Sequence, residues 1–428
     1  MTSPLRKLKA DSKYNRKLRI ALLGSRGVPH TYGGAEAFYI ELAPRLVQRG
    51  HEVIVYNRSS LYKEKPTHYK GARLIYTGSI ESKSLGSITH AFSSMLDVIF
   101  RKTDVILCVN SGVLPQLLIP RLLGKRVCVN MDGLQWKRDK WGTFAKKYLY
   151  WNAKIAKRIC PKGIITDAYE MHRVYMDEFQ TASACITYGA NIEMSENPQI
   201  VTQYGLNPGE YYLIASRMVP ENNADLIIDA FNRTKTRKLL AIAGGENYKS
   251  KFVEKIKRMA GPRVKFLGHI SNLDHVKELH CCCYAYLHGH MLGGINPAMV
   301  KALGYGNMIL ALNTLFNYEA VQDAGILFEL DSEDLRVKLQ YIEDNPAVAV
   351  AYRLRAPERI RESFTWDHIV DQYEEFFLQL AAGDDPTRIH STVADADNFA
   401  AKLALEQAAG LAARISLYSA NSAAKPRV

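Results

Sequence analysis

Two glycine-containing segments of the chain have the residue pattern of a turn that binds anions. The segment SRGVPHTYGGAEAF places Gly33 and Gly34 directly before a run with helical spacing of apolar residues. Further along, YLHGHMLGGINPAMVKALGYG places Gly293 and Gly294 before Asn296 and a proline. Asparagine followed by proline is a strong helix-start signal, and glycines before it expose free backbone N–H groups. We expect the second segment to bind a phosphate or diphosphate, whereas the first could equally be a tight strand-to-helix turn.

Arginine and histidine side chains stand at the ends of predicted strands in the second half of the chain. Arg217 ends the run EYYLIASR, and a guanidinium there could neutralise a diphosphate, although a surface arginine would look the same in sequence. His288 and His290 lie at another strand end. Residues two apart in a strand point to opposite faces, so we expect these histidines not to share a metal ion and predict no metal site.

The segment 131–159 interleaves aromatic and basic residues and contains Trp136, Trp141 and Trp151. Basic and aromatic side chains on one helix suit an anionic membrane surface. Two alternatives stay open: base stacking on a nucleic acid, and a core helix with a solvated basic back.

The elements that must position these residues form two successive sets of predicted strands and helices. Short apolar runs bounded by glycine and polar residues fit interior strands of a parallel sheet. The first set runs from LRIALLG to ACITYGA, and the second from EYYLIASRMV to ILFEL, with a polar segment at roughly 190–209 between them. We therefore predict an α/β protein with two doubly wound, Rossmann-like domains that face a cleft, since such sheets bind ligands beyond the carboxyl ends of their strands.

Composition narrows the class of protein. A length of 428 residues suits two domains, and 47% hydrophobic residues excludes wholesale disorder. The net charge of +13 favours an anionic partner. The seven cysteines show no CxxC spacing, so we expect free thiols in a reducing cytoplasm. We find no secretory leader and no apolar run near the about 20 residues of a membrane-spanning helix.

Four strings, RGVPHTYGGAEAF, DGLQWKRDKW, RMVPENN and HGHMLGGINPAMVKALG, resemble in this order a bacterial branch of glycosyltransferase family 4 that contains rhamnosyltransferases. The resemblance extends over roughly residues 17–380. It implies a GT-B fold, in which two Rossmann-like domains face a cleft and a C-terminal helix crosses back to the first domain. It also implies transfer of a sugar from a nucleotide diphosphate donor, with retention and without a metal or other cofactor.

With this resemblance, we divide the chain into five segments. They are a loose basic arm (1–16), an acceptor domain (17–195), a nucleotide-sugar domain (196–365), a crossover helix (366–382) and an Ala-rich tail (383–428).

The resemblance also assigns roles to single residues. Arg217 would neutralise the leaving diphosphate, and Asp132 would orient the acceptor or the sugar hydroxyls, so both are candidate catalytic residues. On the donor side we place Gly33, Gly34, Arg217, His288, Gly293, Gly294, Asn296 and Lys301, and on the acceptor and membrane side Trp136, Lys137, Arg138, Trp141 and Tyr188.

Four positions depart from the family pattern. Gln135 and Gly293 each replace an expected glutamate, Asn222 a lysine, and Lys301 the glutamate that binds the donor ribose. The changes at Gly293 and Asn222 are typical of this branch. An ammonium only donates hydrogen bonds, so Lys301 cannot accept ribose hydroxyls as a carboxylate does. Either nucleotide binding is altered or activity is weakened. We hypothesise that Lys301 reaches the donor diphosphate and supplies the charge missing at Asn222.

We therefore expect a cytoplasmic glycosyltransferase, peripheral on the inner face of the cytoplasmic membrane. It would move a sugar, with rhamnose as the leading candidate, from a dTDP-, UDP- or GDP-linked donor to a lipid-linked saccharide in surface polysaccharide synthesis. One alternative is a degenerate GT-B protein that binds a ligand or partner without turnover. The other is a basic nucleic-acid-binding protein, which would show steeply salt-dependent binding.

Overall fold

The computed structural model describes residues 4–29, 33–81, 85–131, 133–138, 141–245 and 250–389. The chain divides into two units, 1–390 and 391–428, and all described residues lie in the first. The predicted Ala-rich tail therefore lies outside the described residues beyond residue 389.

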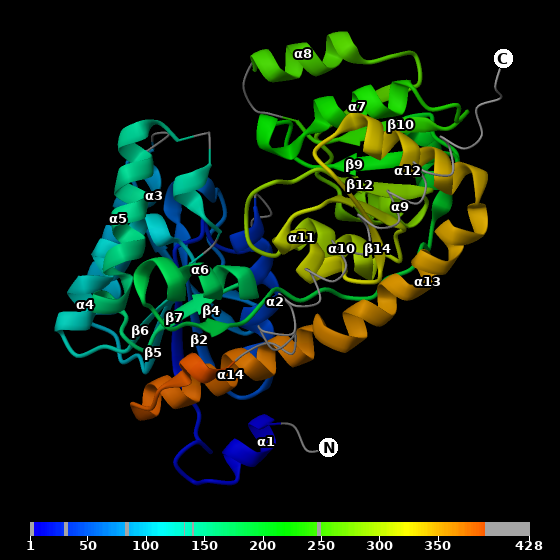
Figure 1. Ribbon diagram of the computed structural model, residues 1–428. Coiled ribbons are helices and arrows are strands. Elements are labelled where there is room, and N and C mark those ends of the chain that lie inside the picture. Colours follow the sequence, from blue (N-terminus) through cyan, green and yellow to red (C-terminus); the bar gives the residue numbers. More distant parts are fainter. Residues whose placement is uncertain are drawn as a thin grey trace, which may run out of the picture. The chain divides into compact units, whose positions relative to one another are not determined.

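An eight-stranded sheet forms the N-terminal domain, with strand order β3-β4-β2-β1-β5-β6-β7-β8 (Figure 1). Its neighbouring strands are parallel except for the β3–β4 pair. Every strand except β3 coincides with an apolar run from which the sequence predicts a strand. The strands are β1 (Arg19–Leu23), β2 (Glu52–Arg58), β3 (His68–Tyr69), β4 (Ala72–Thr77), β5 (Val105–Cys108), β6 (Val127–Asn130), β7 (Ile164–Thr166) and β8 (Ala184–Cys185).

A six-stranded parallel sheet forms the C-terminal domain, with strand order β11-β10-β9-β12-β13-β14. Strands β9 and β12 are neighbours in this sheet, so the loops that follow them meet at one edge. The strands are β9 (Tyr211–Ala215), β10 (Leu239–Ala243), β11 (Val264–Gly268), β12 (Ala285–His288), β13 (Ile309–Leu312) and β14 (Gly325–Phe328).

Helices connect the strands of both sheets. In the N-terminal domain they are α2 (Gly34–Gln48), α3 (Leu85–Val98), α4 (Leu118–Leu122), α5 (Thr143–Ile159) and α6 (Tyr169–Phe179), with the 3₁₀ helices η2 (Ser111–Leu117) and η3 (Gln135–Lys137). In the C-terminal domain they are α7 (Ala224–Asn232), α8 (Lys251–Met259), α9 (Leu273–Cys281), α10 (Pro297–Gly304), α11 (Leu315–Val321), α12 (Ser332–Asp344) and α13 (Pro346–Ser363).

Helix α14 (Trp366–Ala382) crosses from the C-terminal domain back to the N-terminal one (Figure 1). The Thr365 hydroxyl accepts a hydrogen bond from the His368 N–H and caps its start, and Gly383 ends it in a left-handed conformation. Its apolar side chains, including Trp366 and Phe376, are buried in the core of the first sheet. The predicted return helix thus forms at the expected residues.

The basic segment that we expected to be a loose arm begins with a helix, α1 (Pro4–Lys9), that packs against α14. Leu5 is buried in the N-terminal core, and Lys9 pairs with Glu374 of α14. Lys13 and Tyr14 also donate hydrogen bonds to Asp384, so several contacts hold this short segment in place.

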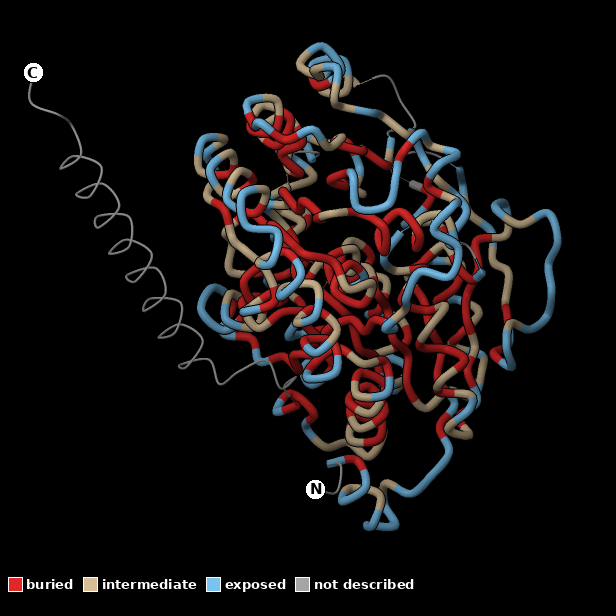
Figure 2. Tube along the Cα trace, turned by 90° about the vertical axis from the view of Figure 1, so that its right-hand side faces the viewer, coloured by how far each residue is buried: buried red, intermediate tan, exposed pale blue. Residues whose placement is uncertain are grey.

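The strands of both sheets are mostly buried, whereas the outer surfaces of helices and loops are exposed (Figure 2). All seven cysteines are free and buried. In the described part of the chain, no helix combines the length and apolarity needed to cross a bilayer.

Candidate functional site

The loops after β9 and β12 are joined by hydrogen bonds at the carboxyl edge of the C-terminal sheet. Asn223 Nδ2 donates to the Gly289 carbonyl at 2.7 Å, and the Met291 N–H donates to the Glu221 carbonyl at 3.0 Å. We call residues 289–296 the glycine turn. Because of these bonds, Arg217 and the glycine turn stand side by side.

Helix α10 begins directly after the glycine turn, as its sequence predicts. The Asn296 side chain accepts a hydrogen bond from the Ala298 N–H at 2.9 Å, and Pro297 takes the first helical position. The turn is also held from α11, because Asn317 Nδ2 donates to the His290 carbonyl at 2.9 Å. This places the amide-rich end of α10 at the cleft.

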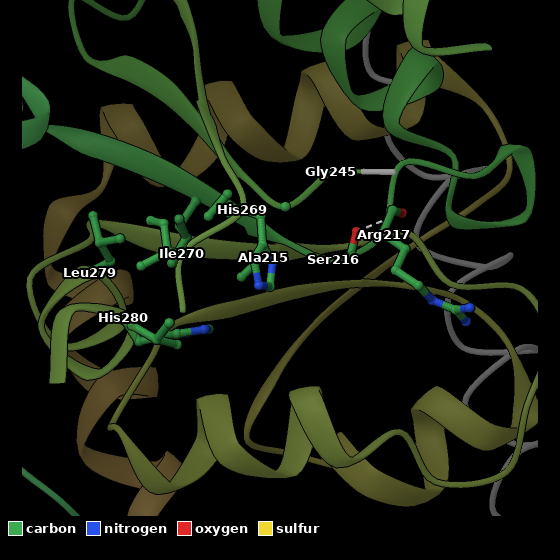
Figure 3. A pocket seen from close by; sticks show the side chains of 12 residues that line it. Ala215, Ser216, Arg217, Gly245, His269, Ile270, Leu279 and His280 are labelled. Atoms are coloured by element: carbon green, nitrogen blue, oxygen red, sulfur yellow. Dashed lines mark hydrogen bonds between the residues drawn. The ribbon is translucent and has the colours of Figure 1, made fainter. Parts of the chain in front are cut away.

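A cavity of about 200 Å³ opens at the carboxyl ends of β9, β10 and β11 (Figure 3). In Figure 3, Arg217 extends away from Leu279 and His280. We call it the β9–β11 cavity. It is lined by Leu213, Ala215, Ser216, Arg217, Ala243, Gly244, Gly245, His269, Ile270, Val276, Leu279 and His280.

The prediction that His288 and His290 point to opposite faces is wrong. Their rings stack with centroids 4.1 Å apart and planes 13° from parallel. The reason is that β12 ends at His288, so strand alternation stops before His290. His288 Nε2 and His290 Nδ1 are buried and have no hydrogen-bond partner among the described residues.

Backbone of the N-terminal domain touches the glycine turn from across the cleft. A Cβ placed on Gly133 would lie 3.2 Å from Gly293 Cα, and one placed on Gly294 would lie 1.8 Å from Asp167 Oδ1. Asp167 follows β7 and is buried. The ends of β6 and β7 thus meet the turn with no room for side chains at these glycines.

Two guanidinium groups, one from each domain, flank the glycine turn. Burial lowers the pKa of His290 to about 3, with further lowering by the positive charges of Arg217 and then Arg138. Arg138 Nη2 would lie 3.6 Å from a Cβ on Gly293. Neither guanidinium has an ion-pair partner among the described residues. Two positive charges and a neutral imidazole therefore lie at this edge of the cleft, together with the carboxyl group of Asp167.

A second cavity, of about 180 Å³, lies between the domains next to the linker. Here α2 faces α10, since a Cβ on Gly34 would lie 3.7 Å from Pro297 Cγ. Lys301 and Tyr188 line this interdomain cavity together with Glu41 and Glu193. Lys301 does not line the β9–β11 cavity, so its contact with a diphosphate stays a hypothesis.

Asn222 has a local role instead of a charged one. Its side chain is buried, and Nδ2 donates to the Arg217 carbonyl at 2.8 Å. It therefore holds the loop that carries Arg217.

The remaining predicted residues lie in different places. Gly33 is the N-cap residue of α2, and Asp132 lies outside the described residues. Trp136 is partly exposed and packs in an aromatic cluster with Tyr150 and the α6 residues Tyr175 and Phe179. Lys137 Nζ lies 3.9 Å from Glu178 Oε1, and Trp141 is exposed.

A buried carboxyl group joins the two domains beside this site. Glu319 of α11 accepts hydrogen bonds from the N–H groups of Tyr169 at 2.6 Å and Glu170 at 3.3 Å. Both donors belong to the first turn of α6, so the C-terminal domain caps a helix of the N-terminal one. Burial raises the pKa of Glu319 to about 8.

Asp167 and Glu319 are site residues that we did not single out from sequence, and His290 was considered there only as a metal ligand. Asp167 ends the predicted strand GIITDA, and this position was a usable signal for a side chain at the cleft. Glu319 lies inside a helix, and its contact crosses between domains, so no local pattern indicates it. Within the described ranges, no three His, Cys, Asp or Glu side chains are grouped as a metal site.

Each half of the chain matches a different family model. Residues 17–191 match a domain of unknown function, DUF1972, and residues 198–361 match the family Glycosyl transferases group 1. No curated protein matches the chain.

This chain matches solved structures of the same fold over nearly the whole length of those structures. The sucrose-phosphate synthase of Thermosynechococcus elongatus is 16% identical with a TM-score of 0.70, over 86% of this chain and 100% of that one. Anabaena HepE, in complex with UDP-glucose, is 16% identical with a TM-score of 0.68, over 84% and 98%. WaaG, a glycosyltransferase involved in lipopolysaccharide biosynthesis, is 13% identical with a TM-score of 0.63, over 84% and 99%.

The fold is thus GT-B, as predicted. The group 1 match over the C-terminal domain supports a glycosyltransferase, and these neighbours show the GT-B fold. Membership of family 4 and of its rhamnosyltransferase branch stays a prediction.

Proposed function

We propose that this protein transfers a sugar from a nucleotide diphosphate donor to a lipid-linked saccharide, with retention and without a metal. The nucleoside occupies the β9–β11 cavity, and the diphosphate lies at Arg217 and the glycine turn. One observation carries this proposal: the cavity, the guanidinium and the turn share the carboxyl edge of β9 and β12. Ligands of parallel sheets bind at such edges.

The chemistry needs placement and charge more than it needs reactive side chains. In a retaining transfer without a covalent intermediate, the leaving phosphate oxygen takes the acceptor proton on the same face of the sugar. Arg217 and the N–H groups of the turn stabilise the negative charge that develops, an effect of about 3 kcal/mol per well-placed donor. Asp132 and Asp167, which follow the neighbouring strands β6 and β7, are our candidates for orienting hydroxyl groups. We propose dTDP-rhamnose as the first donor to test, on the branch resemblance.

A lipid-linked acceptor requires access to a membrane, and exposed apolar residues support such access. They gather on and next to α3, α4 and α5, three helices that all contact η2. On α5, the spacing of Phe144, Lys147, Trp151 and Lys154 gives one exposed stripe of aromatic and basic side chains. Phe144 is 87% exposed, which is unfavourable in water and favourable at a lipid interface. We call the exposed residues Phe92, Leu96, Phe100, Leu122, Phe144 and Trp151 of this region the apolar surface.

The experiment is a thermal-shift screen against dTDP-, UDP- and GDP-linked sugars, followed by measurement of donor hydrolysis. A donor at 100 times its Kd should stabilise the protein by about 2.7 kcal/mol. The variant Arg217→Ala should lose most of this stabilisation. If no nucleotide sugar stabilises the wild-type protein, the proposed function is wrong.

Hydrolysis separates the two alternatives from the main proposal. Stabilisation without any hydrolysis or transfer would favour a degenerate, ligand-binding GT-B protein. Oligonucleotide binding that weakens steeply with salt, without stabilisation by a nucleotide sugar, would favour the nucleic-acid-binding alternative.

A further inference from the structure

Arg138 belongs to the N-terminal domain, but its guanidinium lies at the glycine turn of the C-terminal domain. The residue follows the 3₁₀ helix η3. Its Nη2 atom would lie 3.5 Å from a Cβ on Gly133 and 3.6 Å from one on Gly293, so it stands where the two backbones meet. Sequence reasoning placed Arg138 on the acceptor and membrane side, together with Lys137.

The guanidinium of Arg138 has no acceptor among the described residues. Its Nε atom is buried without a hydrogen-bond partner, although the residue as a whole is partly exposed. Arg217, the nearby cation from the other domain, is also unpaired within the described ranges. Two guanidinium groups held close to one imidazole repel each other, and partial burial of a charged donor without an acceptor is unfavourable.

The imidazole between these charges cannot neutralise them. His290 stays neutral at physiological pH, and its Nδ1 atom is buried without a partner. The two unpaired guanidinium groups therefore favour an anionic ligand at this wall.

We propose that Arg138 binds the donor diphosphate from the side opposite Arg217, so that the diphosphate joins the two domains. This inference rests on the proposed function and names a further binding residue for it. A guanidinium presents a fork of N–H donors that matches phosphate oxygens, and one arginine from each domain gives the two phosphates one cation each. Arg138 thereby supplies the charge missing at Asn222, the role that we first gave to Lys301.

The position of Arg138 couples binding to closure of the cleft. Without an anion, the like charges of Arg138 and Arg217 favour separation of the domains. A bound diphosphate attracts both guanidinium groups, so it draws the domains together and favours the contact of Gly133 with Gly293.

The test measures the affinity of inorganic pyrophosphate and of UDP, dTDP and GDP by calorimetry. Pyrophosphate is the primary probe, since it carries the charges without a base. We expect Arg138→Ala to weaken pyrophosphate binding by about 10- to 100-fold, the loss of one charge-assisted contact. Arg138→Lys should bind with intermediate affinity. Arg336→Ala is the matched control, because this arginine lies on α12 and pairs with Glu333, and the variant should bind within about twofold of wild type.

A merely structural role for Arg138 makes a different prediction. It would lower the thermal midpoint of the protein without ligand, whereas an unpaired guanidinium should leave that midpoint unchanged or raised when removed. Pyrophosphate affinity equal to wild type in Arg138→Ala would overturn the inference, even if sugar transfer persists and the proposed function stands. Loss of pyrophosphate binding in this variant would support the inference, even if no nucleotide sugar is ever turned over. A wild-type protein that binds neither pyrophosphate nor any nucleoside diphosphate would overturn both.

Discussion

Gly294 is a position at which one methyl group should matter. Because an added Cβ would lie 1.8 Å from Asp167 Oδ1, Gly294→Ala forces the glycine turn away from the N-terminal domain. A displacement of about 1 Å at a reacting site can cost about 10²-fold in rate, and we expect a loss of this size in turnover of the donor sugar.

The matched control is Gly142→Ala, since a Cβ on Gly142 meets nothing within 4 Å. It should leave turnover unchanged. Wild-type turnover in Gly294→Ala would show that the contact of Asp167 with the turn is not needed.

At the residue scale, sequence patterns find single-loop features and miss contacts between domains. The Asn296–Pro297 helix start depends on consecutive residues and forms as predicted. The proximity of the Arg138 side chain to Gly293 depends on how the two domains meet. No residue spacing within one domain predicts such a contact. The prediction that His288 and His290 point to opposite faces was wrong, because it extended the alternation of a strand past the last residue of β12.

Helix α14 is attached to the N-terminal domain through a buried carboxylate. Glu374 is nearly inaccessible, and its oxygens lie 2.8 Å from His51 Nε2 and 2.9 Å from Arg49 Nη1, with Lys9 of α1 as a third partner. Burial acts to raise the pKa of Glu374, but the hydrogen bonds from His51, Lys9 and Arg49 outweigh it and lower the pKa to about 2.

This lowered pKa predicts a loss of stability in acid. The charged form is favoured in the folded state, so the contribution is complete above the ordinary glutamate value of 4.5 and is lost as pH falls toward 2. At pH 7, Glu374→Gln should lower the free energy of unfolding by about 2 to 3 kcal/mol. Urea unfolding at pH 7 and at about pH 3 should show the difference between wild type and variant shrinking in acid.

The neighbouring carboxyl group serves as the control. Burial raises the pKa of Glu375, so Glu375→Gln should not destabilise the protein at pH 7. Equal effects of the two substitutions would mean that the Glu374 contacts contribute nothing specific.

At the element scale, the apolar runs predict nearly every strand of both sheets. Strand β3 was missed because its two residues, His68 and Tyr69, carry no alternation to detect. Helix α1 was missed for a related reason: its sequence, PLRKLK, is polar, and its stability comes from Leu5 and Lys9 contacting a helix from the other end of the chain.

At the scale of the whole molecule, the apolar surface predicts binding to anionic membranes. We expect the wild-type protein to float with vesicles that contain phosphatidylglycerol and not with pure phosphatidylcholine. Replacing two large apolar side chains that enter the interface, Phe144→Ser with Trp151→Ser, should reduce vesicle binding by at least about tenfold, since each buries apolar area worth about 25 cal/mol per Å².

The control places the same change on the other domain. Val350 and Leu354 of α13 are also exposed, so replacing both by serine removes two exposed apolar side chains from another helix. If both double variants bind vesicles equally, α5 is not the membrane-facing helix.

The return of α14 has a consequence for the order in which the molecule is made. Trp366, Tyr373 and Phe376 fill the core beneath strands that leave the ribosome at the beginning of synthesis. Domains commonly fold one after another as they emerge, starting with the first. Here the first domain stays without part of its interior until translation is almost finished, so the nascent chain must keep an open apolar groove in solution while the second domain is produced.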